Sequence, residues 1–235
     1  MNPRTAKPGD VISYLEMCSQ VGVNLQRGMN YHLRGNISVI LMNLRPNAPY
    51  ADRVESSGRV LIYEGHDAPK THTTPNPKGI DQPAASQGGT LTQNGLFLKA
   101  AGRFKNGDNP EIVEVYEKLH RGIWVFNGAF MLTDAWQEES GLRKVYKFKL
   151  EITEGSAAAI SSSAKEDADR NRIIPPRVKL EVWQRDKGRC RVCGATTDLH
   201  FDHVIPFSKG GSSMIADNIQ ILCGRHNLAK GDKIE

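Results

Sequence analysis

Four metal-binding side chains near the C-terminus constrain the fold of this chain more than any other feature. Cys190 and Cys193 form one pair at CxxC spacing, and Cys223 and His226 form a second pair with the same spacing. Zinc takes four tetrahedral ligands from thiolates and imidazoles, and two short-spaced pairs can supply them. The pattern therefore predicts a structural zinc site. A region of about 60 residues buries too little apolar area to be secure alone, so we expect the metal to hold it folded.

Cysteine usage also indicates the cellular compartment. The fourth cysteine, Cys18, lies alone in an apolar stretch, where we expect a buried small hydrophobe and not a nucleophile. Paired spacing favours metal ligation over a disulfide framework, which points to a reducing compartment. Residues 1–10 contain no apolar signal core, and no run approaches the roughly 18 apolar residues of a membrane span. We therefore expect a cytoplasmic protein that has no membrane partner.

The positive charge of the chain is concentrated in the zinc-binding region. The formal net charge is +5, and residues 171–235 hold eleven Lys or Arg against seven Asp or Glu, which accounts for four of the five excess charges. A basic balance suits a polyanionic partner such as nucleic acid, although many basic proteins bind none. Charge alone leaves the function open.

Apolar runs and turn residues predict a β-rich first domain. Turns are expected at Asn127-Gly128 and at 139–142, and residues 96–101 and 110–118 are short apolar segments. A helix is expected from Val11 to Val21, capped by Asp10. The segments with the apolar or alternating pattern of strands are 38–44, 59–63, 122–126, 129–132 and 144–150.

Composition divides the chain into a first domain, a linker and a second domain. We expect the first domain at 1–151, an Ala/Ser-rich linker at 152–174 and the second domain at 175–235, which opens with a short helix from 177 to 186. That helix should bury Val178, Val182 and Trp183. Within the first domain, residues 66–90 are rich in Pro, Thr, Gly, Gln and Ser and form a long loop, either solvated or ordered by a ligand.

A second set of polar residues lies between the two zinc-ligand pairs. By spacing alone, the four zinc ligands fit a purely structural zinc knuckle as well as they fit a domain with a catalytic role. The additional residues favour a catalytic role. They are Asp202-His203-Val-Ile-Pro206, Gly210-Gly211, Asp217-Asn218, and the closing Asn227 with Lys230-Gly231.

This ordered set resembles the HNH (ββα-metal) nucleases, specifically their zinc-containing branch, over residues 190–231. The resemblance implies that Asp202 and Asn227 bind a catalytic divalent ion and that His203 is the general base. His226 replaces the usual fourth zinc cysteine, and Asn227 fills a position often occupied by His. Carboxylate and amide oxygens suit Mg²⁺ or Mn²⁺ better than zinc, and imidazole accepts a proton near neutral pH.

Neighbouring residues are expected to support this centre. Asn218 should orient the loop that carries His203, so we count it with the catalytic residues. His200, two residues before Asp202, is either a substrate contact or an ordinary partly exposed histidine, and we favour the second. The residues predicted to hold flanking phosphates are Lys209, Arg225 and Lys230.

The first domain carries a second resemblance, over residues 35–151, to the SRA (SET and RING associated) domains that bind modified cytosine in DNA. Tyr50 and Tyr63 fit the positions that stack on a flipped base, and Asp52 is the expected acceptor for its exocyclic amine. In the alternative reading, Tyr63 belongs to a strand core and Tyr50 to a turn. The motifs behind the resemblance are Ser38-Val-Ile-Leu, Tyr50-Ala-Asp52, Leu61-Ile-Tyr63-Glu-Gly65, Gly89-Thr-Leu-Thr-Gln-Asn94 and Phe126-Asn-Gly-Ala-Phe-Met-Leu132.

Together these features predict an α+β protein with an SRA-like β-barrel followed by a small zinc-stabilised HNH domain. The expected function is cleavage of double-stranded DNA that carries 5-methylcytosine or 5-hydroxymethylcytosine, as in restriction of modified foreign DNA. A modified-DNA-binding module without nuclease activity, and a nuclease whose reader recognises a different mark, are the alternatives. One HNH site cuts one strand, so we expect a homodimer.

Overall fold

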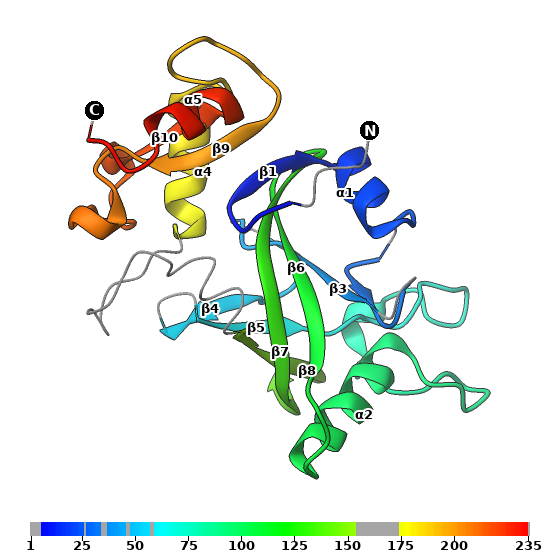
Figure 1. Cartoon of the computed structure of the whole chain (residues 1–235). Helices are drawn as coiled ribbons and strands as arrows, with labels where there is room; N and C mark the ends of the chain where they lie inside the picture. Colours follow the sequence, from blue (N-terminus) through cyan, green and yellow to red (C-terminus); the bar gives the residue numbers. More distant parts are fainter. Residues whose placement is uncertain are drawn as a thin grey trace.

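Strands dominate the structure of this chain. The computed structural model describes residues 6–25, 27–33, 37–45, 48–56, 59–153 and 174–234, and its strands form one branched sheet (Figure 1). The α+β class, rich in β-structure and with few helices, is confirmed. Within the described ranges, no helix is both long and apolar enough to cross a bilayer.

We call the described residues 6–153 the β-rich lobe and residues 174–234 the C-terminal lobe. The C-terminal lobe contains α4 (Pro176–Arg185), β9 (Leu199–His203), η4 (Phe207–Lys209), η5 (Ala216–Asn218), β10 (Ile219–Cys223) and α5 (Gly224–Lys230). The β-rich lobe contains β1 (Asp10–Ser13), α1 (Tyr14–Val21), β2 (Met29–Asn30), β3 (Ser38–Met42), β4 (Arg53–Glu55), β5 (Val60–Glu64), η3 (Pro77–Gly79), α2 (Gln93–Lys105), β6 (Glu111–His120), β7 (Ile123–Ser140) and β8 (Arg143–Ile152).

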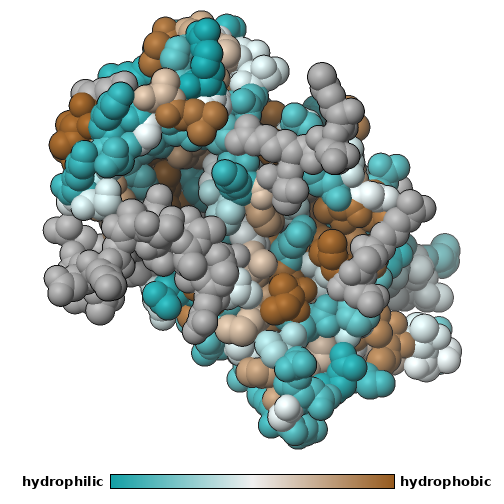
Figure 2. All heavy atoms as spheres, viewed as in Figure 1, coloured by the Kyte–Doolittle hydropathy of each residue, from teal (hydrophilic) through white to brown (hydrophobic). Residues whose placement is uncertain are grey.

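The sheet runs through both lobes. Its strand order is β10-β9-β1-β7-β6-β3-β2, and a branch leads from β7 through β8 and β5 to β4. All these pairings are antiparallel except that of β3 with β6. In the space-filling view the C-terminal lobe is seated on the β-rich lobe (Figure 2).

Strand β7 is the longest strand of the sheet and pairs with three others. Its first residues pair with β1 and β6 and its later residues with β8. The predicted turn at Asn127-Gly128 is wrong, because the strand continues there through a β-bulge: Val115 lies opposite Gly128 and Tyr116 opposite Phe126. The predicted turn at 139–142 is confirmed, since β7 and β8 remain paired up to Ser140 and Arg143.

The N-terminal helix begins later than predicted. Asp10 does not cap it; residues 10–13 form β1, and Ser13 is the N-cap of α1. The Ser13 hydroxyl accepts from the Glu16 amide while the Glu16 carboxylate accepts from the Ser13 amide, which is a capping box. Cys18 is buried in the apolar cluster beneath this helix, as predicted.

The remaining predicted segments agree with the structure in position, except that the apolar segment 96–101 belongs to a longer helix that was not predicted. The expected strands at 38–44, 59–63 and 144–150 are β3, β5 and β8. The helix at 177–186 is α4, which buries Val178 and Val182, while Trp183 is only partly buried against the same cluster. The apolar segment 96–101 lies inside α2, a helix whose N-cap is Thr92. Most of the predicted linker, residues 154–173, lies outside the described residues.

The core of the C-terminal lobe extends into the β-rich lobe. One buried cluster joins Leu119 and Val125, from β6 and β7, to the apolar side chains of the C-terminal lobe. These include Val178, Val182, Leu199, Phe201, Ile219, Ile221 and Leu222. The two lobes therefore bury apolar surface jointly.

A buried ion pair crosses the same boundary. Lys179 Nζ on α4 lies 3.1 Å from Glu117 Oε2 and donates to Asn127 Oδ1 at 3.0 Å, and Asn127 Nδ2 donates to the same Glu117 oxygen. Lys179 and Glu117 are 3% and 4% exposed. The β7 bulge is what places Asn127 in this network, so the irregularity in the strand has a clear packing role.

Replacing Lys179 by alanine should destabilise the protein strongly. Removal of one partner of a buried ion pair typically costs about 3–5 kcal/mol, because the remaining charge is left uncompensated. We expect the free energy of unfolding in urea to fall by that amount for Lys179→Ala. The exposed Lys99→Ala is the matched control and should change it by less than about 0.5 kcal/mol. An unchanged denaturation midpoint for Lys179→Ala would contradict the pairing.

Candidate functional site

The four predicted zinc ligands converge in the C-terminal lobe. The ligand atoms of Cys190, Cys193, Cys223 and His226 all lie within 4.8 Å of one another. Cys193 Sγ and Cys223 Sγ are 3.8 Å apart, and His226 Nδ1 is 3.4 Å from Cys190 Sγ and 3.2 Å from Cys223 Sγ. Two sulfurs bound to one tetrahedral zinc at about 2.3 Å are separated by about 3.8 Å. The residues therefore fit a structural zinc ion.

The local environment also favours the thiolate form of Cys190 that zinc requires. Burial alone raises the pKa of this thiol, but backbone N–H groups of Cys223, Cys193 and Val192 and the imidazole of His226 lower it to about 6. A thiol with this pKa is largely ionised at neutral pH, and metal binding then displaces few protons.

Asp202 and His203 lie side by side at the end of β9. β9 pairs with β10, and α5, which carries Asn227, packs against both strands. The His203 ring is held by a 2.8 Å hydrogen bond between its Nε2 and the hydroxyl of Ser213, and by edge contact with Phe207 at a centroid distance of 6.0 Å. Ser213 is buried, so the imidazole has a fixed orientation.

Asn218 holds the loop that follows His203. Its side-chain oxygen accepts from the Ile205 amide at 2.8 Å, and its Nδ2 donates to the Ile205 and Ser212 carbonyls. Gly211 permits this close packing, because a Cβ there would lie 1.8 Å from the Ile205 carbonyl oxygen. The side chain therefore makes the loop contacts that we expected of it; its effect on catalysis remains a prediction.

Lys230 differs from its predicted role at the DNA surface. Its side chain is 1% exposed, and its Nζ donates to the His203 carbonyl at 2.7 Å and lies 3.0 Å from Asp202 Oδ2. Gln220 Nε2 donates to the same carboxylate oxygen at 3.2 Å. A buried ammonium cannot reach a phosphate on the surface, so Lys230 neutralises and positions Asp202 instead.

The other two predicted phosphate contacts lie on the surface. The Lys209 side chain is 43% exposed and its Nζ is 3.7 Å from Asp232, while the exposed Arg225 lies against the imidazole of His226. Asn227 is partly buried on α5. Oxygen donors on β9 and α5 together with surface cations give the chemical composition of a phosphodiester-cleaving site that uses a divalent ion.

His200 is neither exposed nor placed to contact a substrate. It is 5% exposed, its Nδ1 lies 2.9 Å from Asp10 Oδ1, and its Nε2 lies 3.2 Å from Asp198 Oδ1. Burial opposes protonation, but the two carboxylates outweigh it and raise the pKa of His200. The expectation of a partly exposed histidine is therefore wrong, because a carboxylate from β1 covers it.

Two of the three residues predicted to read a base, Tyr50 and Tyr63, lie beside His66 in the β-rich lobe. The ring of His66 is 6.4 Å from that of Tyr50 and 6.5 Å from that of Tyr63, whose hydroxyl lies 3.3 Å from His66 Nε2. Burial and the positive charge of Arg27 lower the pKa of His66 to about 4, so its ring is neutral at neutral pH. Tyr63 is 2% exposed and belongs to the main apolar core.

Asp52 is held beside these rings by backbone amides. Its two oxygens accept from the amides of Glu64 at 2.9 Å and Asn43 at 3.2 Å. Burial outweighs these hydrogen bonds and raises the pKa of Asp52 to about 6. A carboxylate oxygen can accept more than one hydrogen bond, so each oxygen of Asp52 retains an acceptor site for a ligand.

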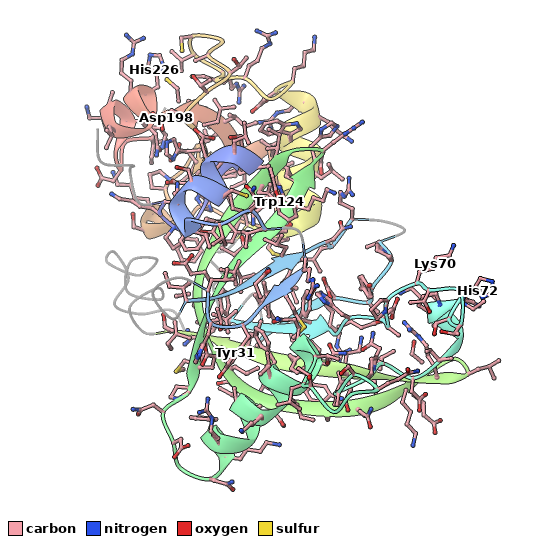
Figure 3. The ribbon with its side chains drawn as sticks, turned by 90° about the vertical axis from the view of Figure 1, so that its right-hand side faces the viewer. Tyr31, Lys70, His72, Trp124, Asp198 and His226 are labelled. Carbon is pink, nitrogen blue, oxygen red and sulfur yellow. The ribbon has the colours of Figure 1, made fainter. Side chains whose placement is uncertain are left out.

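The long loop at 66–90 covers part of this site. Lys78 Nζ lies 4.0 Å from the centre of the Tyr50 ring, held by the Pro49 carbonyl and by Asp67. At the tip of the loop, Lys70 and His72 are exposed and project away from the body of the molecule (Figure 3). A ligand stacked on the face of Tyr50 that Lys78 covers therefore requires this lysine to move.

The C-terminal lobe is similar in sequence to a known protein family. Residues 190–233 match the HNH endonuclease family. The match covers the zinc ligands, Asp202, His203 and Asn227, and it supports metal-dependent nuclease chemistry in the C-terminal lobe. No curated protein matches the chain.

Solved structures similar to this one include the SRA domain of SUVH5. In complex with hemimethylated CG DNA it has a TM-score of 0.44 and 22% identity, covering 63% of this chain and 89% of that chain. The same domain bound to fully hydroxymethylated CG DNA has a TM-score of 0.43 and 20% identity, covering 64% and 91%. SUVH6 of Arabidopsis thaliana in complex with SAM has a TM-score of 0.42 and 18% identity, covering 70% and 30%.

Sequence reasoning missed three supporting residues of the C-terminal site. Ser213 contacts His203, and Gln220 contacts Asp202. Lys230 was expected at the DNA surface but is buried and bonds to the His203 carbonyl. Neither Ser213 nor Gln220 belongs to a spaced motif, and a lysine beside a glycine gives no sign of burial. Their roles follow from the pairing of β9 with β10 and from the packing of α5.

Loss of one zinc ligand should unfold the C-terminal lobe. We expect Cys190→Ser to lower the zinc content below one ion per chain and to lower the melting temperature, since structural zinc contributes on the order of 10 kcal/mol. Cys18→Ala is the matched control, because Cys18 is buried in another cluster and should leave zinc content unchanged. Normal zinc content and melting in Cys190→Ser would exclude this ligand set.

Proposed function

We propose that this protein is a DNA endonuclease that recognises a modified cytosine with its β-rich lobe and hydrolyses a phosphodiester bond with its C-terminal lobe. The observation that carries the proposal is the position of Asp202 and His203, consecutive residues at the end of β9, beside the helix that bears Asn227. These residues lie within the segment that matches HNH endonucleases.

In this mechanism His203 is the general base. An imidazole accepts a proton from water near neutral pH, and Ser213 keeps the ring in one orientation. Asp202 and Asn227 would hold a divalent ion through hard oxygen ligands that suit Mg²⁺ or Mn²⁺, and when bound the ion would stabilise charge on the departing oxygen. Lys230 holds Asp202 and the backbone of His203 in place, while Lys209 and Arg225 bind flanking phosphates.

Recognition of the base is assigned to Tyr50 and Asp52, whereas Tyr63 is buried in the apolar core and fits the alternative reading of a strand-core residue. Support comes from the position of Tyr50 beside the neutral ring of His66 and from the amide-held carboxylate of Asp52, which can accept from the exocyclic amine of a flipped cytosine. Lys70 and His72 at the loop tip would approach the DNA, because both are exposed and project away from the body of the molecule (Figure 3). The substrate proposed is double-stranded DNA with 5-methylcytosine or 5-hydroxymethylcytosine.

The proposed biological role is restriction of modified foreign DNA in the cytoplasm. A double-strand break needs two HNH sites, so we propose that two copies act together as a homodimer. Sedimentation of the protein with and without modified duplex distinguishes a stable dimer from two molecules that meet on DNA.

Cleavage should depend on both the mark and His203. We expect one plasmid, prepared with and without cytosine methylation, to be cut with Mg²⁺ or Mn²⁺ only in its methylated form. His203→Ala should lower the rate by about 10²- to 10⁴-fold while binding is retained. Equal cutting of the two plasmids would remove the modified-base reader, and binding without cutting by the wild type would leave a modified-DNA-binding module.

Asp52→Ala should weaken discrimination between modified and unmodified DNA. Loss of a hydrogen bond to a charged group costs about 1.5–3 kcal/mol, so we expect a fall of about 10- to 100-fold in the ratio of the two cutting rates. The ratio is measured within one variant, so a smaller folded fraction cancels. Asp81→Ala is the control, because Asp81 accepts from the Lys144 amide in the same manner. An unchanged ratio would exclude Asp52 as the edge contact.

A further inference from the structure

Strand β1 joins the two lobes by pairing on both of its edges. Val11 lies opposite Val125 of β7 on one side and opposite Leu199 of β9 on the other. β9 is the strand that ends in Asp202 and His203. The N-terminal strand of the chain is therefore the direct backbone connection between the β-rich lobe and the proposed catalytic strand.

Asp10 anchors this connection through a side chain. It is 8% exposed, lies opposite His200 in the strand pairing, and its Oδ1 is 2.9 Å from His200 Nδ1. The second oxygen of Asp10 accepts from the Lys7 amide at 2.9 Å. Because side chains two residues apart lie on the same face of a strand, His200 fixes the face of β9 from which Asp202 projects.

His200 is also connected to α5, through Asp198. Asp198 Oδ1 lies 3.2 Å from His200 Nε2, and the Asp198 carbonyl accepts from the Gly224 amide at 2.8 Å. Gly224 begins α5, and a Cβ there would lie 2.1 Å from Asp198 Oδ2, so the approach is tight. In Figure 3, Asp198 and His226 lie in the C-terminal lobe and Trp124 of β7 lies toward the seam between the lobes.

Two further contacts join the lobes at points away from this strand. The shared core places Leu119 and Val125 against the C-terminal lobe, and the buried pair of Lys179 with Glu117 closes the boundary at α4. Strand pairing, core packing and ion pairing act at different points on the boundary. Together they hold the two lobes in one arrangement, within which the contact of Asp10 with His200 sets the local position of β9.

We propose that Asp10 is a positioning residue that fixes the proposed catalytic strand relative to the base-reading lobe, so that cleavage occurs at one set distance from the modified cytosine. The proposal rests on the proposed function. Asp10 touches neither the DNA nor the ion site; it acts through His200 on β9 and, through Asp198, on α5.

The test maps cut positions on a duplex that carries one modified cytosine. We expect the wild type to cut at one or two adjacent bonds. Asp10→Ala should spread the cuts over several bonds and lower the cutting rate by roughly 10- to 100-fold, since small misplacements of reacting groups have effects of this size. Affinity for the modified duplex should stay within about twofold.

Two variants separate positioning from simple loss of structure. Asp10→Asn keeps an oxygen that accepts from His200 and should restore the narrow cut pattern. Asp108→Ala, on an exposed loop, should behave like the wild type. Zinc content and melting are measured for every variant, and the wild-type pattern tests the proposal even if Asp10→Ala does not fold.

Either of two results overturns the inference while leaving the proposed function intact. One is a wild type that cuts at widely scattered distances from the mark. The other is a folded Asp10→Ala that cuts at wild-type positions and rate. A wild type that does not cut modified DNA at all overturns the proposed function itself, so the two failures are distinguishable.

Discussion

The arrangement of this molecule depends on a four-residue strand that lies between two others. β1 contributes one edge to β7 and the other to β9, and so converts two sets of strands into one sheet. The C-terminal lobe would bury little apolar surface alone. Backbone pairing with β1 and the core that it shares with β6 and β7 compensate for its small size, and a zinc ion held by the four converging ligands would add to them.

The charge balance at the C-terminal site follows from burial. Asp202 is 15% exposed in its side chain and has the ammonium of Lys230 at 3.0 Å. An isolated carboxylate in that position would carry a large desolvation cost, which the buried cation offsets. Lys230 also bonds to the backbone of His203, so one side chain fixes both members of the Asp202-His203 pair.

Local sequence patterns predicted the elements that depend on local information. The sequence was sufficient to predict strands β3 and β5 from their continuous apolar runs, and the cluster of four zinc ligands from their spacing. Each of these patterns has few alternative explanations. Helix α2 was missed because Gly95 and Gly102 interrupt its apolar pattern and its Thr92 cap is weak evidence alone.

Features decided by distant residues could not be predicted in this way. Asn127-Gly128 has the local chemistry of a tight turn, but pairing with β6 and the contacts of Asn127 with Glu117 and Lys179 make it a bulge. Val11 and Ile12 fit a helical pattern, yet their partners on β7 and β9 place them in a strand. The contact of Asp10 with His200 joins residues 190 positions apart, which no local pattern indicates.

The length of β7 has an evolutionary consequence. This strand reaches from the seam with the C-terminal lobe to the hairpin at Ser140, and its side chains alternate between opposite faces except at the bulge beside Asn127 and at the register shift between Leu132 and Asp134. Insertion of one residue would reverse that alternation beyond the insertion, unless another bulge absorbed it. Related proteins that alter the span of this strand should therefore do so in pairs of residues, in increments of about 7 Å.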